Sequence, residues 1–247
     1  VPGSSAGGQQ PKFAVFNGES KSHVIVKFAS KDDNVIAQRS NDILITEYHA
    51  TAVLRDNGFL SAETRLIEMD QRLFLETQRF DRHGAFGRSS MVSLQSIDNE
   101  FAGIGHHWSN VMRELHALGL ITETDALTAE ALRHFGQLIN NTDMHLGNLS
   151  LSIEGDSFRL LPIYDMCSMG FAPKSGGEIQ PFNFEPSDIE SHHLTDHELT
   201  LVKKMAHDFW ENVTNDQKIS DEFRAYLDRG NPVAPLLLAE DKPSPKR

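Results

Sequence analysis

The period of the hydrophobic pattern changes near residue 93, and this change limits the folds that the chain can adopt. Before residue 93 the apolar segments alternate with polar residues and are rich in β-branched and aromatic side chains, which is typical of strands. After residue 93 the apolar residues recur at helical spacing. The pattern therefore predicts an α+β fold, with a β-rich N-terminal lobe over residues 1–92 and a mostly helical C-terminal lobe over residues 93–240.

Two hairpins and one helix account for the expected N-terminal lobe. Asn17-Gly18 is a turn signal between the first two strands, and Asp70-Gln71 separates the next two. Apolar residues at helical spacing predict a helix over 42–57. The polar segment 30–41 is expected to be a loop. The predicted strands are 12–16, 23–29, 64–69 and 72–80, and Gly58 is the expected cap of the helix.

The C-terminal lobe is expected to consist of helices interrupted by one hairpin. A short polar loop at 142–148 separates the second helix from two brief strands. The tail 241–247 is expected to be disordered. The predicted helices are 106–118, 128–139, 195–213 and 216–228, and the predicted strands are 149–153 and 158–163.

Composition narrows the function classes. The 247 residues carry a net charge of −12, which argues against direct binding to nucleic acid, because phosphate backbones are bound by basic surfaces. No apolar run reaches the roughly 18–20 residues of a membrane span, and the first residues do not resemble a signal peptide. Cys167 is the single cysteine, so neither an intrachain disulfide nor a four-thiolate zinc site can form. These features predict a cytoplasmic protein that binds neither membranes nor nucleic acid.

The polar loop at 142–148 carries the first pair of residues that points to a reaction. Asp143 and Asn148 have the D-x-x-x-x-N spacing of the catalytic loop in protein kinases. Transfer of a phosphoryl group from ATP needs a carboxylate near the acceptor hydroxyl and oxygen ligands for Mg²⁺. We therefore interpret Asp143 as the group that accepts the hydroxyl proton and Asn148 as a metal ligand.

Three further residues complete the expected nucleotide site. Asp165 follows the second strand of the C-terminal hairpin, where a second metal-binding carboxylate is expected. Lys27 lies in the strand 23–29 like the lysine of V-A-I-K, and it would contact the α- and β-phosphates of ATP. Glu47, in the next helix, would pair with Lys27. With these roles, the two lobes have the outline of a two-lobed protein-kinase-like fold.

Six sequence blocks that occur in order resemble the HipA-type serine/threonine protein kinases. The resemblance covers roughly residues 4–170. The predicted helices after residue 170 match the family only in their general helical character, without a matching sequence block. The blocks are SSAGGQQPKF (4–13), HVIVKF (23–28), TEYHA (46–50), QRFDR (78–82), NNTDMHLGNLSL (140–151) and YDMCS (164–168).

The resemblance implies a serine/threonine protein kinase that uses ATP and Mg²⁺ and that inhibits growth as the toxin of a type II toxin–antitoxin system. It further implies a cognate antitoxin as a partner. The implied substrate is a protein, such as an aminoacyl-tRNA synthetase or another translation factor.

The resemblance also implies that a glycine-containing loop binds the nucleotide and carries an autophosphorylated serine. Ser4 is the better match for the modified serine, and Ser5 is close behind. Phosphorylation would eject the loop, because the added charge would be repelled by the phosphates of ATP. Lys12 would hold the closed loop or a phosphate, although the segment before it is one residue longer than the usual end of this loop. The implied nucleotide-binding residues of the loop are Ser4, Ser5, Gly7 and Gly8.

Two other functions remain open from the residues themselves. The segment DMHLGN also resembles the D-x-H-x-x-N loop of aminoglycoside and choline kinases, which would make the chain a small-molecule phosphotransferase. A pseudokinase that acts as a binding module is the second alternative. Arg79, Asp81 and Arg82 are expected to form a structural ion-pair cluster near the junction of the lobes, and His145 is expected to shape its loop.

Overall fold

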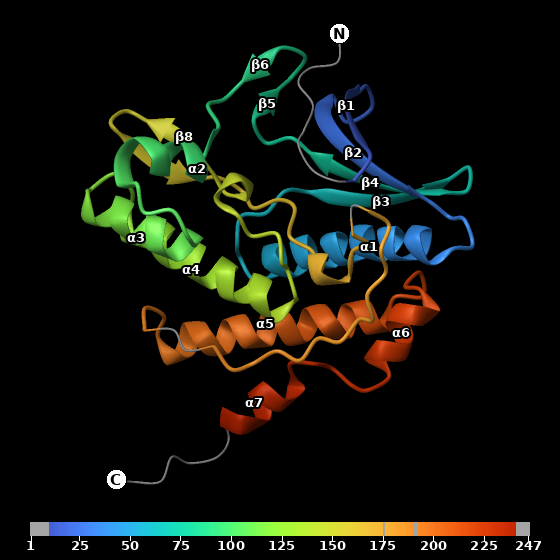
Figure 1. Cartoon of the computed structure of the whole chain (residues 1–247). Helices are drawn as coiled ribbons and strands as arrows, with labels where there is room; N and C mark the ends of the chain where they lie inside the picture. The colour runs from blue at the N-terminus through green and yellow to red at the C-terminus, as the bar shows by residue number, and fades with distance from the viewer. Residues whose placement is uncertain (1–9, 175, 190–191, 241–247) are drawn as a thin grey trace, which may run out of the picture.

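The computed structural model describes residues 10–174, 176–189 and 192–240, and these residues form two lobes (Figure 1). The N-terminal lobe is a four-stranded antiparallel sheet with helix α1 (Val35–Asp56) beneath it. The order of its strands is β1 (12–17), β2 (22–30), β4 (72–78) and β3 (64–69). The helical lobe lies on the other side of α1, and α5 (Asp196–Asn215) runs alongside α1 (Figure 1). The predicted tail at 241–247 lies outside the described residues.

The two predicted N-terminal hairpins are confirmed. The first pairs β1 (Lys12–Asn17) with β2 (Ser22–Ser30), and the second pairs β3 (Thr64–Met69) with β4 (Arg72–Gln78). In this register Lys27 lies between Lys12 on one neighbouring strand and Leu75 on the other. The sheet therefore brings two lysines next to each other on adjacent strands.

Helix α1 begins at Val35, so the prediction of a loop over 30–41 is wrong from residue 35 onward. Asn34 caps the helix, and its side-chain oxygen accepts a hydrogen bond from the Ala37 N–H at 2.9 Å. The first turns contain Arg39 and Asp42, which are polar but only 2% and 0% exposed. Because the buried face of these turns is polar, it gives no hydrophobic periodicity, and the sequence pattern could not reveal it. The predicted cap at Gly58 is confirmed by its φ of +81°.

Asp42 connects α1 to the helical lobe. Its carboxylate accepts hydrogen bonds from the N–H and the hydroxyl of Ser220, at 2.8 and 2.6 Å, and Ser220 is the N-cap of α6 (Asp221–Leu227). Burial raises the pKa of Asp42 to about 6, although the bonds from Ser220 oppose this shift. The charged carboxylate is therefore disfavoured in the folded protein.

We expect Asp42→Asn to change the pH dependence of stability. The folded-state pKa of Asp42 lies above its unfolded value, so the contribution of Asp42 to stability is lost as the pH rises from about 4 to 6. The asparagine variant has no such loss at this position. The unfolding free energy of the variant relative to the wild type should rise by on the order of 3 kcal/mol across this window. Urea unfolding at pH 4, 5, 6 and 7 measures this difference. The prediction would be contradicted if the unfolding free energies of the two proteins changed in parallel with pH.

The four predicted C-terminal helices are confirmed with shifted ends, and the core of the lobe lies between them. Phe135 of α4 and Phe209 of α5 are fully buried and pack edge to face at 6.3 Å. Trp210 is also fully buried, and its indole N–H donates to the Leu138 carbonyl at 3.0 Å. The helices are α3 (Trp108–Ala117), α4 (Glu123–Leu138), α5 and α6.

The predicted C-terminal hairpin is confirmed as β8 (Ser150–Glu154) and β9 (Ser157–Leu160). The structure adds β7 (Val92–Ser93) to the edge of β8. The remaining elements were not predicted, because each is too short to show a period. They are β5 (Arg82–His83), β6 (Gly87–Arg88), α2 (Leu94–Ile97), the π-helical turn η1 (Asp98–Ala102), the 3₁₀ turns η2 (Leu146–Asn148) and η3 (Met169–Phe171), and α7 (Ala234–Glu240).

Among the described residues, no helix is both long enough and apolar enough to span a bilayer.

Candidate active site

A cleft of about 450 Å³ lies where the sheet meets the helical lobe. It collects residues that are far apart in the sequence, and five of the predicted site residues are among them. Those five are Lys12, Lys27, Asp143, Asn148 and Asp165. The other lining residues are Ile25, Thr77, Gln78, Arg79, Phe80, Asp81, Met91, His145, Gly147 and Tyr164.

Lys27 is buried between two carboxylates at the base of the cleft. Its ammonium donates to Glu47 Oε2 at 2.5 Å and to Asp165 Oδ1 at 2.6 Å. The pairing with Glu47 is the one expected from the sequence. Burial alone would lower the pKa of Lys27, but the two carboxylates outweigh burial and hold that pKa above its usual value. Lys27 therefore stays charged at any physiological pH.

The two carboxylates that contact Lys27 differ in their surroundings. Glu47 is 1% exposed, and burial raises its pKa despite the opposing charge of Lys27. Its second oxygen, Oε1, has no hydrogen-bond partner among the described residues. The side chain of Asp165 is one-third exposed (33%). Burial opposes its ionisation, but the neighbouring Lys27 outweighs burial and lowers the pKa of Asp165. Asp165 is thus the ionised carboxylate that faces the cleft.

Asp165 has left-handed backbone geometry, with a φ of +55°. This region is uncommon for residues other than glycine, although aspartate and asparagine enter it more readily than others. Asp165 lies five residues after the end of β9. In this conformation the Asp165 carboxylate contacts the Lys27 ammonium.

Asp143 and Asn148 face each other across the predicted polar loop. The Asn148 amide nitrogen donates to the Asp143 carbonyl at 2.7 Å and to Asp143 Oδ2 at 3.3 Å. The side chain of Asp143 is half exposed, and His145 Nε2 lies 3.7 Å from its Oδ1. The Asn141 side-chain oxygen also accepts a bond from the Asp143 N–H at 3.1 Å. The loop thus presents one carboxylate to the cleft and holds it with neighbouring amides.

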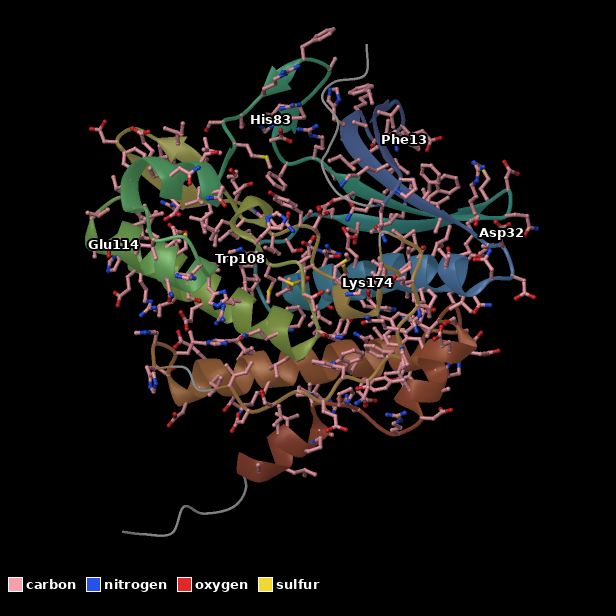
Figure 2. All side chains as sticks on the ribbon, in the orientation of Figure 1. Phe13, Asp32, His83, Trp108, Glu114 and Lys174 are labelled. Atoms are coloured by element: carbon pink, nitrogen blue, oxygen red, sulfur yellow. The ribbon has the colours of Figure 1, made fainter. Side chains whose placement is uncertain are left out.

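The helical lobe fixes this loop from below. Trp108, the first residue of α3 and labelled in Figure 2, donates its indole N–H to the His145 carbonyl at 2.9 Å. Gly136 of α4 leaves room for Met144 of the loop, because a Cβ at this glycine would lie 2.3 Å from the Met144 sulfur. Gly147 N–H donates to His145 Nδ1 at 3.0 Å, so His145 also shapes the loop, as predicted.

Asp165 and Asn148 are chemically suited to hold a magnesium ion. Asp165 offers an ionised carboxylate at the cleft. Asn148 uses its nitrogen to donate to Asp143, so its amide oxygen is the atom left for a cation. Within the described ranges no cluster of three histidine, cysteine or acidic side chains could hold a metal. Two oxygen ligands suit Mg²⁺, which keeps several waters and binds substrate phosphates as well.

The predicted ion-pair cluster is confirmed, and it also borders the cleft. Arg79 donates to both carboxylate oxygens of Asp81, at 2.8 and 2.6 Å, and Arg82 donates to the same carboxylate at 2.7 Å. These charge-assisted bonds outweigh burial and lower the pKa of Asp81. Sequence reasoning treated this cluster as structural and did not identify Arg79 and Asp81 as lining residues.

Sequence reasoning also missed an aromatic wall of the cleft. The rings of Phe80 and Tyr164 lie 6.1 Å apart, and both line the cavity. The Tyr164 hydroxyl lies 2.7 Å from the Ser150 hydroxyl, which fixes the ring. In the sequence, only the positions of these two residues could have indicated that they line the site. Phe80 lies inside the QRFDR block, and Tyr164 directly precedes Asp165. The predicted loop residues Ser4, Ser5, Gly7 and Gly8 lie outside the described residues.

Two lobes that meet at a cleft, with a lysine–glutamate pair from the N-terminal lobe and a D-x-x-x-x-N loop from the helical lobe, define a kinase-like class of protein. Among the solved structures that share this fold are the following two. One is HipA of Shewanella oneidensis MR-1, from a complex with HipB and operator DNA, with 18% identity, a TM-score of 0.54, and coverage of 96% of this chain and 64% of that one. The other is the Helicobacter pylori proinflammatory kinase CtkA, with 14% identity, a TM-score of 0.57, and coverage of 95% and 92%.

The chain belongs to the family of HipA-like C-terminal domains, whose profile matches residues 4–226. Among curated proteins, Toxin YjjJ of Escherichia coli (strain K12) is 37% identical over 231 residues. That match covers 91% of this chain and 51% of the toxin, so the chain spans about half the length of this relative. The family and the kinase-like fold expected from the sequence blocks are therefore confirmed.

Proposed function

We propose that the protein transfers the γ-phosphoryl group of ATP to a serine or threonine hydroxyl of a protein. The observation that carries this proposal is the contact of one buried lysine with Glu47 on α1 and with Asp165, in the same cleft as Asp143. A kinase needs a lysine held by a helix glutamate and a metal-binding aspartate near it. A charged lysine with two carboxylates is costly to bury, and a phosphate-binding role explains why it is there.

The residues around the cleft support a division of roles. Asp143 would accept the proton as the acceptor oxygen forms its bond to phosphorus, while the bond from phosphorus to the β-phosphate oxygen breaks and ADP leaves. Asn148 and Asp165 would hold Mg²⁺, which supplies positive charge to the phosphate oxygens. Lys27 would contact the α- and β-phosphates, with Glu47 holding its ammonium in place. Proton acceptance fits the half-exposed position of the Asp143 carboxylate.

The lining of the cleft also suits a nucleotide. Phe80 and Tyr164 offer aromatic faces, and Ile25 offers an apolar side chain, which together suit an adenine ring. Lys12 lies beside Lys27 in the sheet and lines the same cleft, so it would add a second positive charge near the phosphates. The segment before it, with Ser4, Ser5, Gly7 and Gly8, would close over the nucleotide.

Family membership supports a protein acceptor and a role in growth inhibition. The relative Toxin YjjJ is named a toxin, and the related HipA was solved together with HipB. We propose by this likeness a growth-inhibiting toxin in the cytoplasm, with a cognate antitoxin and with a translation factor such as an aminoacyl-tRNA synthetase as substrate.

We propose that the boundary between the two lobes lies between residues 92 and 93.

Autophosphorylation is the direct test of this function. The purified protein, incubated with Mg²⁺ and γ-labelled ATP alone, should incorporate label at Ser4 or Ser5, and the Ser4→Ala/Ser5→Ala variant should lose at least about 90% of it. Peptide mass spectrometry locates the label. Ser157→Ala, on the hairpin β8–β9, is the matched control and should label normally.

The same assay separates the alternatives. A small-molecule phosphotransferase would leave the protein unlabelled but would consume ATP when choline or an aminoglycoside is added. A pseudokinase would transfer no phosphate under either condition. Either outcome would contradict the proposed function.

A further inference from the structure

The guanidinium of Arg39 joins α1 to the far end of the helical lobe. The side chain is 2% exposed, although arginine is rarely buried unless it is paired. Its Nε and Nη2 donate to the two carboxylate oxygens of Glu222 on α6, at 3.1 and 2.5 Å. This two-point contact fixes the orientation of the guanidinium as well as its position.

Arg39 also contacts the segment that follows Asp165. Its Nη1 donates to the Phe171 carbonyl at 3.4 Å, and its guanidinium carbon lies 4.6 Å from the centre of the Phe171 ring. The same ring stacks on Phe223 of α6, with centroids 4.2 Å apart and planes inclined by 16°. Phe171, at the end of η3, is therefore held by α1 and by α6 together.

A second contact from α1 holds the same segment closer to Asp165. The Thr46 hydroxyl accepts a bond from the Ser168 N–H at 3.3 Å, and the Ser168 hydroxyl donates to the Ile139 carbonyl at 2.8 Å. Ser168 is completely buried. Arg39 and Thr46 are about two helical turns apart, so α1 grips the segment at two points along one face. Glu47, the partner of Lys27, directly follows Thr46.

We propose that Arg39 is a positioning residue that sets the distance between Glu47 and Asp165, and thereby keeps the site assembled without an activating signal. This inference rests on the phosphoryl transfer proposed above. For α1 to swing away from the cleft, as a movable helix would, Arg39 would have to leave both Glu222 and Phe171. The guanidinium would then lose its paired carboxylate in a buried setting, which disfavours such a motion.

The chemistry of the contact explains why arginine occupies this position. A lysine ammonium could pair with Glu222, but it has no planar face for the Phe171 ring and no second pair of N–H groups for the Phe171 carbonyl. Substitution by lysine should therefore keep the charge and lose the connection to the segment after Asp165. This difference makes Arg39→Lys an informative variant beside Arg39→Met.

The test compares kinetics with local hydrogen exchange in the full chain. Arg39→Met should lower the maximal rate constant (kcat) of autophosphorylation by at least about 10-fold. The ATP concentration at half-maximal rate (KM) should change by less than about 3-fold, because a small misplacement of reacting groups affects the chemical step most. Backbone amides at 168–171 should exchange at least about 10-fold faster, while those at 205–209 in α5 stay unchanged. Arg39→Lys should give an intermediate kcat.

A matched control shows whether the loss of any arginine beside an aromatic ring would have the same effect on kcat and on hydrogen exchange. Arg72→Met removes an arginine that also lies over an aromatic ring, that of Phe28, at 5.8 Å, but on the sheet and away from the cleft lining. It should leave kcat and the exchange at 168–171 unchanged. If Arg39→Met does not fold, Glu222→Gln weakens the same contact with little change of volume and should shift both measurements in the same direction.

The outcomes of this experiment are distinguishable. A folded Arg39→Met with kcat within twofold of the wild type, or with unchanged exchange at 168–171, would refute the positioning role and leave the proposed kinase activity standing. A loss of kcat that only matches the unfolded fraction would also refute it. A wild-type protein that transfers no phosphate would refute the kinase activity, and the positioning role with it.

Discussion

Asp143→Asn is expected to lower phosphoryl transfer by about 10²- to 10⁴-fold, the range over which a positioned proton acceptor contributes to a rate. The amide keeps the size of the carboxylate and can still accept a hydrogen bond, but it cannot take the proton of the acceptor hydroxyl. The side chain of Asp143 is half exposed, so the melting temperature should stay within about 2 °C of the wild-type value.

Labelling with γ-labelled ATP and thermal unfolding measure the two effects of Asp143→Asn. Asp156→Asn, in the exposed turn of the hairpin β8–β9, is the matched control and should change neither. Growth of cells that express the full-length protein adds a third measurement, since the inactive variant should no longer inhibit growth. Growth inhibition that persists with Asp143→Asn would show that the toxic effect does not come from phosphoryl transfer.

Lys27→Met is expected to remove activity and stability together. Loss of the ammonium near the phosphates should lower the rate by about 10²-fold or more, the scale measured when one preorganised group is removed from an active site. Glu47, which is 1% exposed, would lose its buried partner, and breaking a buried pair costs about 3–5 kcal/mol. Urea unfolding and the labelling assay measure the two losses.

The stability loss of Lys27→Met should depend on pH in a defined direction. Without Lys27, burial and the nearby negative charge of Asp165 hold the folded-state pKa of Glu47 above its unfolded value. Such a group favours the folded state below its unfolded pKa and loses that contribution as the pH rises. The variant should therefore be more strongly destabilised at pH 8 than at pH 5. Adding Glu47→Gln should recover stability at pH 8 but not activity, and equal losses at both pH values would contradict this account.

The sequence predicts the hairpins and the position of Lys27 well, because alternation of apolar and polar residues survives in a sheet with one covered face. It fails at the start of α1 for a physical reason. There Arg39 and Asp42 face the interior and pair with α6, so the buried face is polar and carries no hydrophobic signal. The missed part of α1, residues 35–41, contains Arg39, on which the proposed positioning role depends.

In the candidate site, too, some residues could be predicted from the sequence and others could not. Asp143 and Asn148 were recognisable because a short loop preserves their spacing in the sequence. The ring pair Phe80 and Tyr164 was not, since its two members meet only after the lobes have packed together. The spacing of residues in the sequence therefore predicts functional residues that lie in one loop. It does not predict parts of the cleft lining to which both lobes contribute.

The left-handed backbone at Asp165 determines how an inert form of this protein should be made for trapping its partners. Alanine at a φ of +55° adds backbone strain of roughly 1–2 kcal/mol, so an Asp165→Ala variant would lose both the carboxylate and local stability. Asparagine enters this region readily and keeps the shape of the side chain while removing its charge. A bait that carries Asp165→Asn would thus present the native surface to the proposed antitoxin or substrate protein. Partners captured on it would report the surface of the folded kinase-like domain.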